Sequence, residues 1–149
     1  MDFGLASVIQ STAPFSDDVY EMTGGTGSLR YMAPEVAVSR PYNYKSDVYS
    51  FGIILWELLS CKKPFVGYGI DKYYNQVVYK GVRPSLEPTW PKELRDLMTK
   101  CWDADIKNRP NAREIAATLE STNTTPTAKV SPRRRLSIVK IKRRPMSCV

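Results

Sequence analysis

The chain has no histidine, only three cysteines, and no apolar run long enough to cross a bilayer. The absence of histidine excludes every mechanism that needs an imidazole within these 149 residues. Cys61, Cys101 and Cys148 have no metal-ligand spacing and form no even disulfide set, which favours a reducing compartment. No basic and then apolar stretch follows Met1, so no signal peptide is predicted. We expect a cytoplasmic or nuclear protein without a membrane span.

Acidic residues are absent from the end of the chain. Residues 1–120 hold 14 basic and 15 acidic residues, and 14 − 15 = −1, whereas residues 121–149 hold 8 basic and no acidic residues, a charge of +8. Because the basic character belongs to a tail, nucleic-acid binding by the whole protein is not predicted. The tail, residues 121–149, is rich in Ser, Thr, Pro and Arg and is predicted to be disordered.

The spacing of apolar residues predicts a mainly helical domain without a series of strands. Ser46 is the expected N-cap of the longest helix, whose apolar residues surround so much of its circumference that we expect it to be central and buried. Gly81 suits the end of the next helix, and Asn111 and Glu114 have capping-box spacing. Helices are predicted at residues 34–38, 46–60, 71–80, 91–101 and 111–120.

Four motifs follow one another along the chain. They read D-F-G at residues 2–4, G-S-L-R-Y-M-A-P-E at 27–35, K-S-D-V-Y-S-F-G at 45–52, and C-W-D at 101–103 with R-P at 109–110. In this order they resemble the eukaryotic protein kinase catalytic domain from its DFG motif onward, over residues 1–120. W-E-L-L at 56–59 and G-V-R-P at 81–84 resemble tyrosine kinases and tyrosine-kinase-like Ser/Thr kinases, although Ile106 stands where that group often has proline.

The resemblance implies the protein-kinase-like (α+β) fold, of which this chain would hold only the mainly α-helical C-lobe and the activation loop. It divides the chain into an activation loop at residues 2–35, a helical subdomain at residues 36–120, and the disordered basic tail at residues 121–149. Partners implied by the family are ATP, a protein substrate, and the kinase N-lobe and catalytic loop, which these 149 residues do not contain.

The resemblance also implies roles for the D-F-G residues. Asp2 would bind the Mg²⁺ that bridges the ATP phosphates, because Mg²⁺ prefers oxygen ligands and accepts one carboxylate together with phosphates. Phe3 would pack beneath it and set the active or inactive pose, and Gly4 would let the backbone move between the two. ATP and Mg²⁺ are therefore the expected cofactors.

Further roles follow from the later motifs. Ser28 stands where Ser/Thr kinases carry a hydroxyl that bonds the catalytic loop, so it favours Ser/Thr over Tyr as acceptor. Glu35 and Arg109 would form a buried ion pair that ties the substrate loop to the helical base. Asp47 would meet partners on the catalytic loop, because a carboxylate in an apolar helix needs hydrogen-bond donors. Apolar side chains of the same helix would support the adenine side of the domain, namely Ile54 and Leu58.

Several hydroxyl residues are candidates for phosphorylation. Thr23 and Thr26 lie nearest the substrate loop, where a phosphate can order the segment against a basic cluster. Ser137 follows three arginines, as in sites of basophilic kinases. The alternative for each residue is a solvent-exposed hydroxyl in a loop or tail. The basic cluster from Arg133 to Arg144 is either a nuclear-localisation signal, a patch for an anionic surface, or simply a solvated tail.

The remaining parts of kinase chemistry do not occur in the sequence. There is no Gly-rich G-x-G-x-x-G loop, and no catalytic loop supplies a base and a second metal ligand. We expect Met1 to be an internal methionine of a longer kinase, and the 149-residue chain not to transfer phosphate by itself. The alternative functions are a non-catalytic kinase-lobe interaction fragment and part of a tyrosine or dual-specificity kinase.

Overall fold

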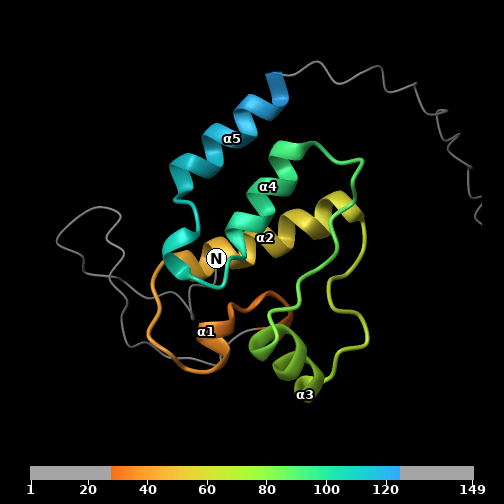
Figure 1. The fold of residues 1–149 in the computed structure, drawn as a ribbon, viewed down its shortest axis with the longest axis vertical. Coiled ribbons are helices and arrows are strands. Elements are labelled where there is room, and N and C mark those ends of the chain that lie inside the picture. The colour runs from red at the N-terminus through yellow and green to blue at the C-terminus, as the bar shows by residue number, and fades with distance from the viewer. Residues whose placement is uncertain (1–27, 125–149) are drawn as a thin grey trace, which may run out of the picture.

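A computed structural model describes residues 28–124 of the chain, and the regular structure in this part is helical, with irregular loops between the helices. No strand forms within it, which confirms the expected mainly helical fold. Figure 1 shows the order of the elements along the chain. They are the 3₁₀ turn η1 (Leu29–Tyr31), α1 (Pro34–Ala37), α2 (Lys45–Ser60), α3 (Ile70–Tyr73), the π-helical turn η2 (Tyr74–Tyr79), α4 (Lys92–Cys101), the 3₁₀ turn η3 (Ile106–Asn108) and α5 (Ala112–Thr124).

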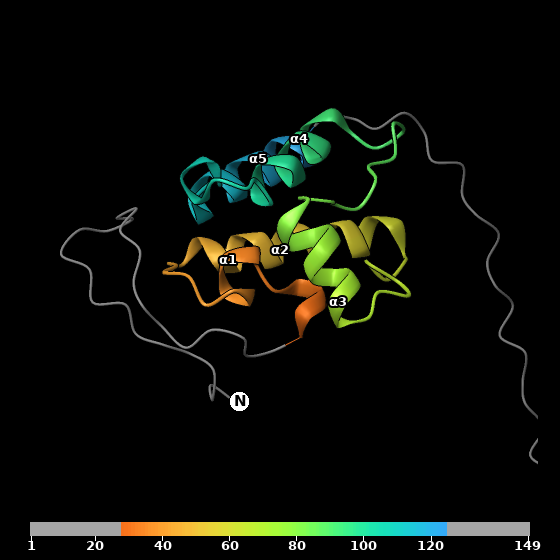
Figure 2. The same ribbon diagram turned by 60° about the horizontal axis from the view of Figure 1, so that its bottom comes forward.

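Helix α2 is the centre of the arrangement. Figures 1 and 2 show α4 and α5 on one side of it and α1 and α3 on another. The close approach of α2 and α4 depends on Gly52, where an added Cβ would lie only 2.7 Å from the Cβ of Cys101. The absence of a side chain at Gly52 therefore lets the two helices cross in contact.

The core consists of two clusters of buried side chains that share α2. The larger one lies between α2, α1 and α4 and contains Met32, Ala33, Val36, Ala37, Tyr49, Ile53, Trp56, Met98 and Trp102. The smaller one joins α2 to α4 and α5 through Val48, Leu97, Cys101 and Ile115. Burial of this apolar surface, rather than helix propensity alone, stabilises elements as short as α1.

The start of α2 corrects one expectation. Ser46 is not the N-cap, because the helix already begins at Lys45. The carbonyl and side-chain oxygens of buried Asn43 accept from the backbone N–H groups of Ser46 and Lys45, at 3.0 Å each. Asn43 therefore satisfies the first free N–H groups of the helix, as a capping residue does.

Full burial of α2 is also wrong. Ile54 is 45% exposed and Leu58 69% exposed, although both are large apolar residues, one in the middle and one in the last turn of the helix. Within residues 28–124 no element covers this side of α2. The exposed apolar strip marks a surface that would lose water on contact with another part of the protein.

The other predicted helices form, with local differences. The stretch predicted at residues 71–80 is α3 followed by the π-helical turn η2, and it ends at Gly81, whose φ of +68° favours glycine. The capping box of α5 is confirmed by reciprocal bonds between Asn111 and Glu114, at 3.0 and 2.7 Å. Helix α5 continues to Thr124, beyond the expected boundary at Glu120.

Among the described helices, none combines the length and the apolar character that crossing a membrane requires.

Candidate functional site

Residues 28–35 form a segment that is fastened to α2 and to the loop after it. The Tyr31 hydroxyl donates to Glu57 Oε2 at 2.7 Å, and the backbone carbonyl of Tyr31 accepts from Ser50 Oγ at 2.7 Å. Arg30 Nη1 donates to the carbonyl of Pro64 at 2.7 Å. The bond to Glu57 raises the pKa of Tyr31 and lowers that of Glu57. These contacts hold the segment in a defined conformation although only η1 and α1 are regular.

Ser28 lies at the edge of a cavity of about 240 Å³. Aromatic and apolar side chains line the cavity, and the rings of Phe65 and Tyr73 meet edge to face with centroids 5.5 Å apart. Ser28 is exposed, and its hydroxyl makes no hydrogen bond within the described part of the chain. This arrangement could hold one apolar side chain of a peptide beside a hydroxyl that is free to bond another group.

Glu35 and Arg109 lie together in the interior. Their carboxylate and guanidinium groups form two parallel bonds, Nη1 to Oε1 at 2.6 Å and Nη2 to Oε2 at 2.9 Å. Arg109 also donates to the carbonyls of Lys45 at 3.1 Å and Asp103 at 3.0 Å. Both side chains are buried, so these bonds offset the loss of hydration. One guanidinium thus joins α1, the start of α2 and the segment before η3.

The buried ring of Tyr49 lies close to two arginines, one of which is Arg109 of this ion pair. The ring of Tyr49 faces the guanidinium carbons of Arg109 and Arg83 at 5.2 and 5.0 Å. Burial raises the pKa of Tyr49, whose hydroxyl lies in the interior near that of Tyr73, and the Tyr73 hydroxyl donates to the Met32 carbonyl at 3.1 Å. The ring face thus lies against both cations, and hydrogen bonds to other groups hold each guanidinium as well.

Asp47 lies in the first turn of α2 and is exposed. Its carboxylate has no bonding partner among the described residues. Neighbouring protein atoms nevertheless displace water from one side of it, and this desolvation raises the pKa of Asp47. Glu35 and Arg109 thus compensate each other's charge, whereas no group among residues 28–124 compensates the charge of Asp47.

The remaining predicted site residues lie outside the described residues. They are Asp2, Phe3, Gly4, Thr23, Thr26 and Ser137. Within residues 28–124 no group of three or more Cys, Asp or Glu side chains could hold a metal ion.

Sequence reasoning did not find two contacts of the site. The Tyr31–Glu57 bond joins residues 26 positions apart, and no local pattern indicates it. Arg83 was seen only as part of a family motif, although it packs on Tyr49 and bonds the Trp102 carbonyl at 3.1 Å. One signal could have indicated a distant contact for Arg83. It stands beside proline in an irregular stretch, where no helical turn brings a charged residue beside it to pair with.

A central helix, the segment of residues 28–35 tied to it, and a buried Glu–Arg ion pair fit the helical lobe of a protein kinase catalytic domain. A family profile for the protein tyrosine and serine/threonine kinases matches residues 1–119, and the chain belongs to this family.

Curated proteins similar to the chain are kinases of related groups. It is 41% identical over 115 residues to the dual specificity protein kinase shkE of Dictyostelium discoideum, covering 76% of this chain and 16% of that protein. It is 44% identical over 123 residues to the serine/threonine-protein kinase VIK of Arabidopsis thaliana, covering 80% and 27%. It is 41% identical over 115 residues to human mitogen-activated protein kinase kinase kinase 7, covering 76% and 18%. The chain thus spans less than a third of the length of these relatives.

Proposed function

We propose that the chain is part of a kinase that transfers the γ-phosphate of ATP to Ser or Thr of protein substrates. The observation that carries this proposal is the pair of parallel hydrogen bonds between Glu35 and Arg109, which fixes residues 28–35 on the helices. That segment brings Ser28 to the edge of an apolar cavity, where a substrate chain can lie. The names of relatives include both Ser/Thr and dual-specificity kinases, so Ser28 is the observation that favours Ser or Thr as acceptor in this proposal.

In this proposal Asp2 holds Mg²⁺ together with the ATP phosphates. The donor set fits the ion, because one carboxylate with phosphate oxygens and water is a usual environment for Mg²⁺. When bound, the ion neutralises charge on the phosphates. Phe3 and Gly4 position the Asp2 carboxylate, and Ser28 bonds the group that orients the substrate hydroxyl. Glu35 and Arg109 hold the platform in place, and Asp47 orients the catalytic loop.

We further propose that the 149 residues alone do not transfer phosphate, because phosphoryl transfer depends on positioning groups that they do not contain. Thr23 and Thr26 are then sites at which phosphate orders the activation loop. Ser137 and the surrounding arginines form a regulatory tail, and a fluorescent reporter fused to residues 121–149 tests whether this tail directs nuclear entry.

The test is phosphate transfer from labelled ATP to arrays of Ser, Thr and Tyr peptides. It uses the longest protein that carries this sequence, with Asp2→Asn as the variant and Asp71→Asn, an exposed carboxylate on α3, as the matched control. We expect Asp2→Asn to lose activity by about a hundredfold or more and the control to retain it. Tyrosine peptides phosphorylated in preference to Ser and Thr peptides would overturn the assigned acceptor.

The same assay on the 149-residue chain tests the second proposal. We expect no transfer above the Asp2→Asn background. Transfer that is lost on Asp2→Asn substitution would show that the chain is catalytic by itself, and transfer unaffected by it would indicate a contaminating kinase.

A further inference from the structure

A groove of about 550 Å³ lies between α1, the end of η2 and η3. It shares no lining residue with the cavity beside Ser28. Apolar side chains from three distant parts of the sequence line it, namely Pro34, Val38, Pro41, Val78 and Ile106. A groove of this size can take one or two apolar side chains of a bound peptide.

Arg83 lines this groove with a positive charge that no carboxylate among residues 28–124 pairs with. Its guanidinium donates only to carbonyl oxygens, those of Trp102 at 3.1 Å, Val77 at 3.0 Å and Val82 at 3.0 Å. The side chain packs on the Tyr49 ring and is half-buried. A cation that is removed from water and bonded to neutral acceptors retains a field that favours a nearby anion.

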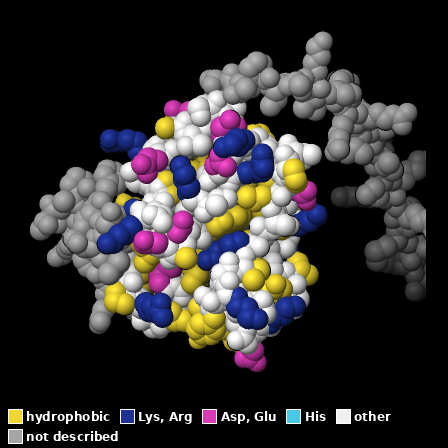
Figure 3. Space-filling view, viewed as in Figure 1, with side chains coloured by type: hydrophobic (Ala, Val, Ile, Leu, Met, Phe, Trp, Pro, Cys, Tyr) yellow, Lys and Arg dark blue, Asp and Glu magenta, His cyan; other side chains and the backbone are white. Residues whose placement is uncertain are grey.

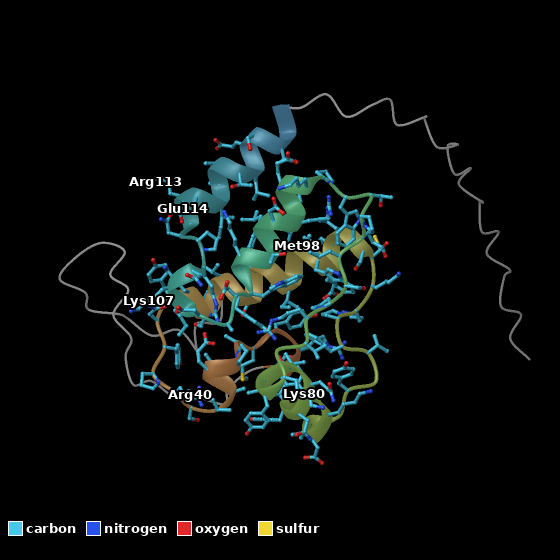
Figure 4. All side chains as sticks on the ribbon, in the orientation of Figure 1. Arg40, Lys80, Met98, Lys107, Arg113 and Glu114 are labelled. Carbon is cyan, nitrogen blue, oxygen red and sulfur yellow. The ribbon has the colours of Figure 1, made fainter. Side chains whose placement is uncertain are left out.

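Three more cations surround the groove. Arg40, Lys80 and Lys107 line it, are exposed, and enter no ion pair within residues 28–124. Figure 4 shows them on the segment after α1, at the end of η2, and on η3. In Figure 3, which has the same orientation, dark blue side chains and yellow apolar surface alternate over this lower part of the molecule. The apolar groove therefore has a basic rim.

The two carboxylates of the groove do not cancel this charge. Glu35 is already paired with Arg109. Asp105 is exposed, and its Oδ1 accepts from the backbone N–H of Lys107 at 3.0 Å. With Glu35 neutralised, four cations face one carboxylate, so the groove carries a net positive charge.

The wall formed by η2 is unusual in its backbone. Residues 74–79 form a π-helical turn, and Val78 and Tyr79 project from it into the groove lining beside Lys80. π-helical turns are rare, and they occur frequently at functional sites. Tyr79 is 70% exposed, which leaves an aromatic ring at the rim with solvent on one side.

We propose that this groove binds an acidic linear segment of a partner protein, with one bulky apolar side chain between the carboxylates. The apolar residue contacts Val38, Val78 and Ile106, and the carboxylates meet Arg40, Lys80 and Arg83. The basic tail of this chain has the same sign as the groove and is repelled by it, so it is not the occupant. The site goes beyond the proposed phosphate transfer, because none of its contacts involves ATP or Ser28.

The experiment measures binding of the full 149-residue chain to a short fluorescein-labelled peptide by fluorescence anisotropy. The peptide carries glutamates on both sides of a Leu-Phe pair, and a second peptide has glutamine in place of every glutamate. We expect the acidic peptide to bind about tenfold or more tightly, and its affinity to fall as salt is added. Helical circular dichroism of every variant shows that the protein used is folded.

Variants locate the binding. Arg40→Glu/Lys80→Glu should weaken the acidic peptide by about tenfold, whereas Lys62→Glu, an exposed lysine outside the groove, should leave it within about twofold. Asp105→Asn should tighten binding by about twofold, because the amide oxygen can still accept from Lys107 while the repelling charge is lost.

The tail needs its own control, since its arginines could also attract an acidic peptide. Arg133→Gln/Arg134→Gln/Arg135→Gln in the full chain should leave the affinity within about twofold. Loss of binding in this tail variant with retention in Arg40→Glu/Lys80→Glu would overturn the proposal. Equal affinity for the glutamate and glutamine peptides, or no binding of either to folded chain, would overturn it as well.

Discussion

The two sides of α2 differ in how far other elements bury them. The adjacent isoleucines Ile53 and Ile54 show this difference in their exposed fractions. Ile53 is completely buried against α1 and α4, while Ile54 is 45% exposed. One side of the helix is packed into the core, where Gly52 contacts α4. The other side leaves apolar side chains exposed to solvent. The side chains of a soluble helix usually divide into apolar and polar faces. The apolar residues Ile54 and Leu58 on this side of α2 therefore remain accessible to solvent, unlike those that face α1 and α4.

On the buried side of α2, the largest loss of stability is expected when the ion pair between Glu35 and Arg109 is broken. Glu35→Gln leaves the Arg109 guanidinium in the interior without a counter-ion, and we expect the free energy of unfolding to fall by about 3–5 kcal/mol. Urea denaturation followed by circular dichroism measures this change. Glu57→Gln is the matched control, because Glu57 pairs with exposed Lys63, and a much smaller change is expected.

A double variant sharpens this prediction. Glu35→Met/Arg109→Met removes both charges, so it should recover part of the stability that either single substitution loses. Recovery is incomplete because the carbonyls of Lys45 and Asp103 lose the donor that Arg109 supplies. Additive losses in the double variant would show that the pair is not a coupled unit.

The neighbouring isoleucines compare the two sides directly. Ile53→Ala creates a cavity in the core and should lower the unfolding free energy by about 2–5 kcal/mol, whereas Ile54→Ala should lower it by less than about 1 kcal/mol. Thermal unfolding of both variants under one condition gives the ratio. Equal losses would mean that another part of the chain covers Ile54 in solution.

A substitution at the contact between α2 and α4 is expected to lower the free energy of unfolding by a smaller amount. Gly52→Ala places a methyl group where the Cys101 Cβ already lies, so the helices must separate, at about 1–3 kcal/mol. Gly69→Ala is the control, because no atom lies within 4 Å of the added Cβ.

Burial raises the pKa of Cys101 to about 12, so its alkylation is slow compared with that of exposed Cys61. Faster alkylation of Cys101 in Gly52→Ala would report the separation, and an unchanged rate and stability would contradict it.

Much of this fold could be predicted from local pattern. The helices at 46–60 and 91–101 follow from apolar spacing, and the Asn111–Glu114 cap from two residues alone. The π-helical geometry of residues 74–79 could not be predicted, because the same apolar residues suit i to i+4 and i to i+5 bonding. The exposure of Ile54 could not either, since periodicity shows which residues share a face and not whether a partner covers it.

The site was less accessible to local reasoning. Glu35 and Arg109 are far apart in sequence, and their pairing came from family resemblance rather than from spacing. The basic groove was missed because residues near 40, 80 and 106 become neighbours only through the tertiary packing of α1, η2 and η3. Contacts between distant segments carry no periodic signal in a single sequence.

The smallest expected effect concerns Asp47, whose charge no group in the described part of the chain compensates. Desolvation raises its pKa in the folded chain, so ionised Asp47 weakens stability as the pH rises through that pKa. Asp47→Asn should therefore stabilise the chain near pH 7. The gain is below about 1 kcal/mol, because the carboxylate is exposed and its loss also removes a favourable interaction with the start of the helix.

The pH dependence separates these two causes. The advantage of Asp47→Asn should shrink as the pH falls through the raised pKa of the folded chain and should be lost below about 3.9, the ordinary pKa of an unfolded aspartate, where both states of the wild-type chain become protonated. Asp71→Asn, in the first turn of α3, removes a carboxylate from a helix start and should bring no such gain. Urea denaturation at several pH values measures both variants. A pH-independent gain would assign the effect to packing, and a loss at pH 7 would mean that Asp47 already has a partner in solution.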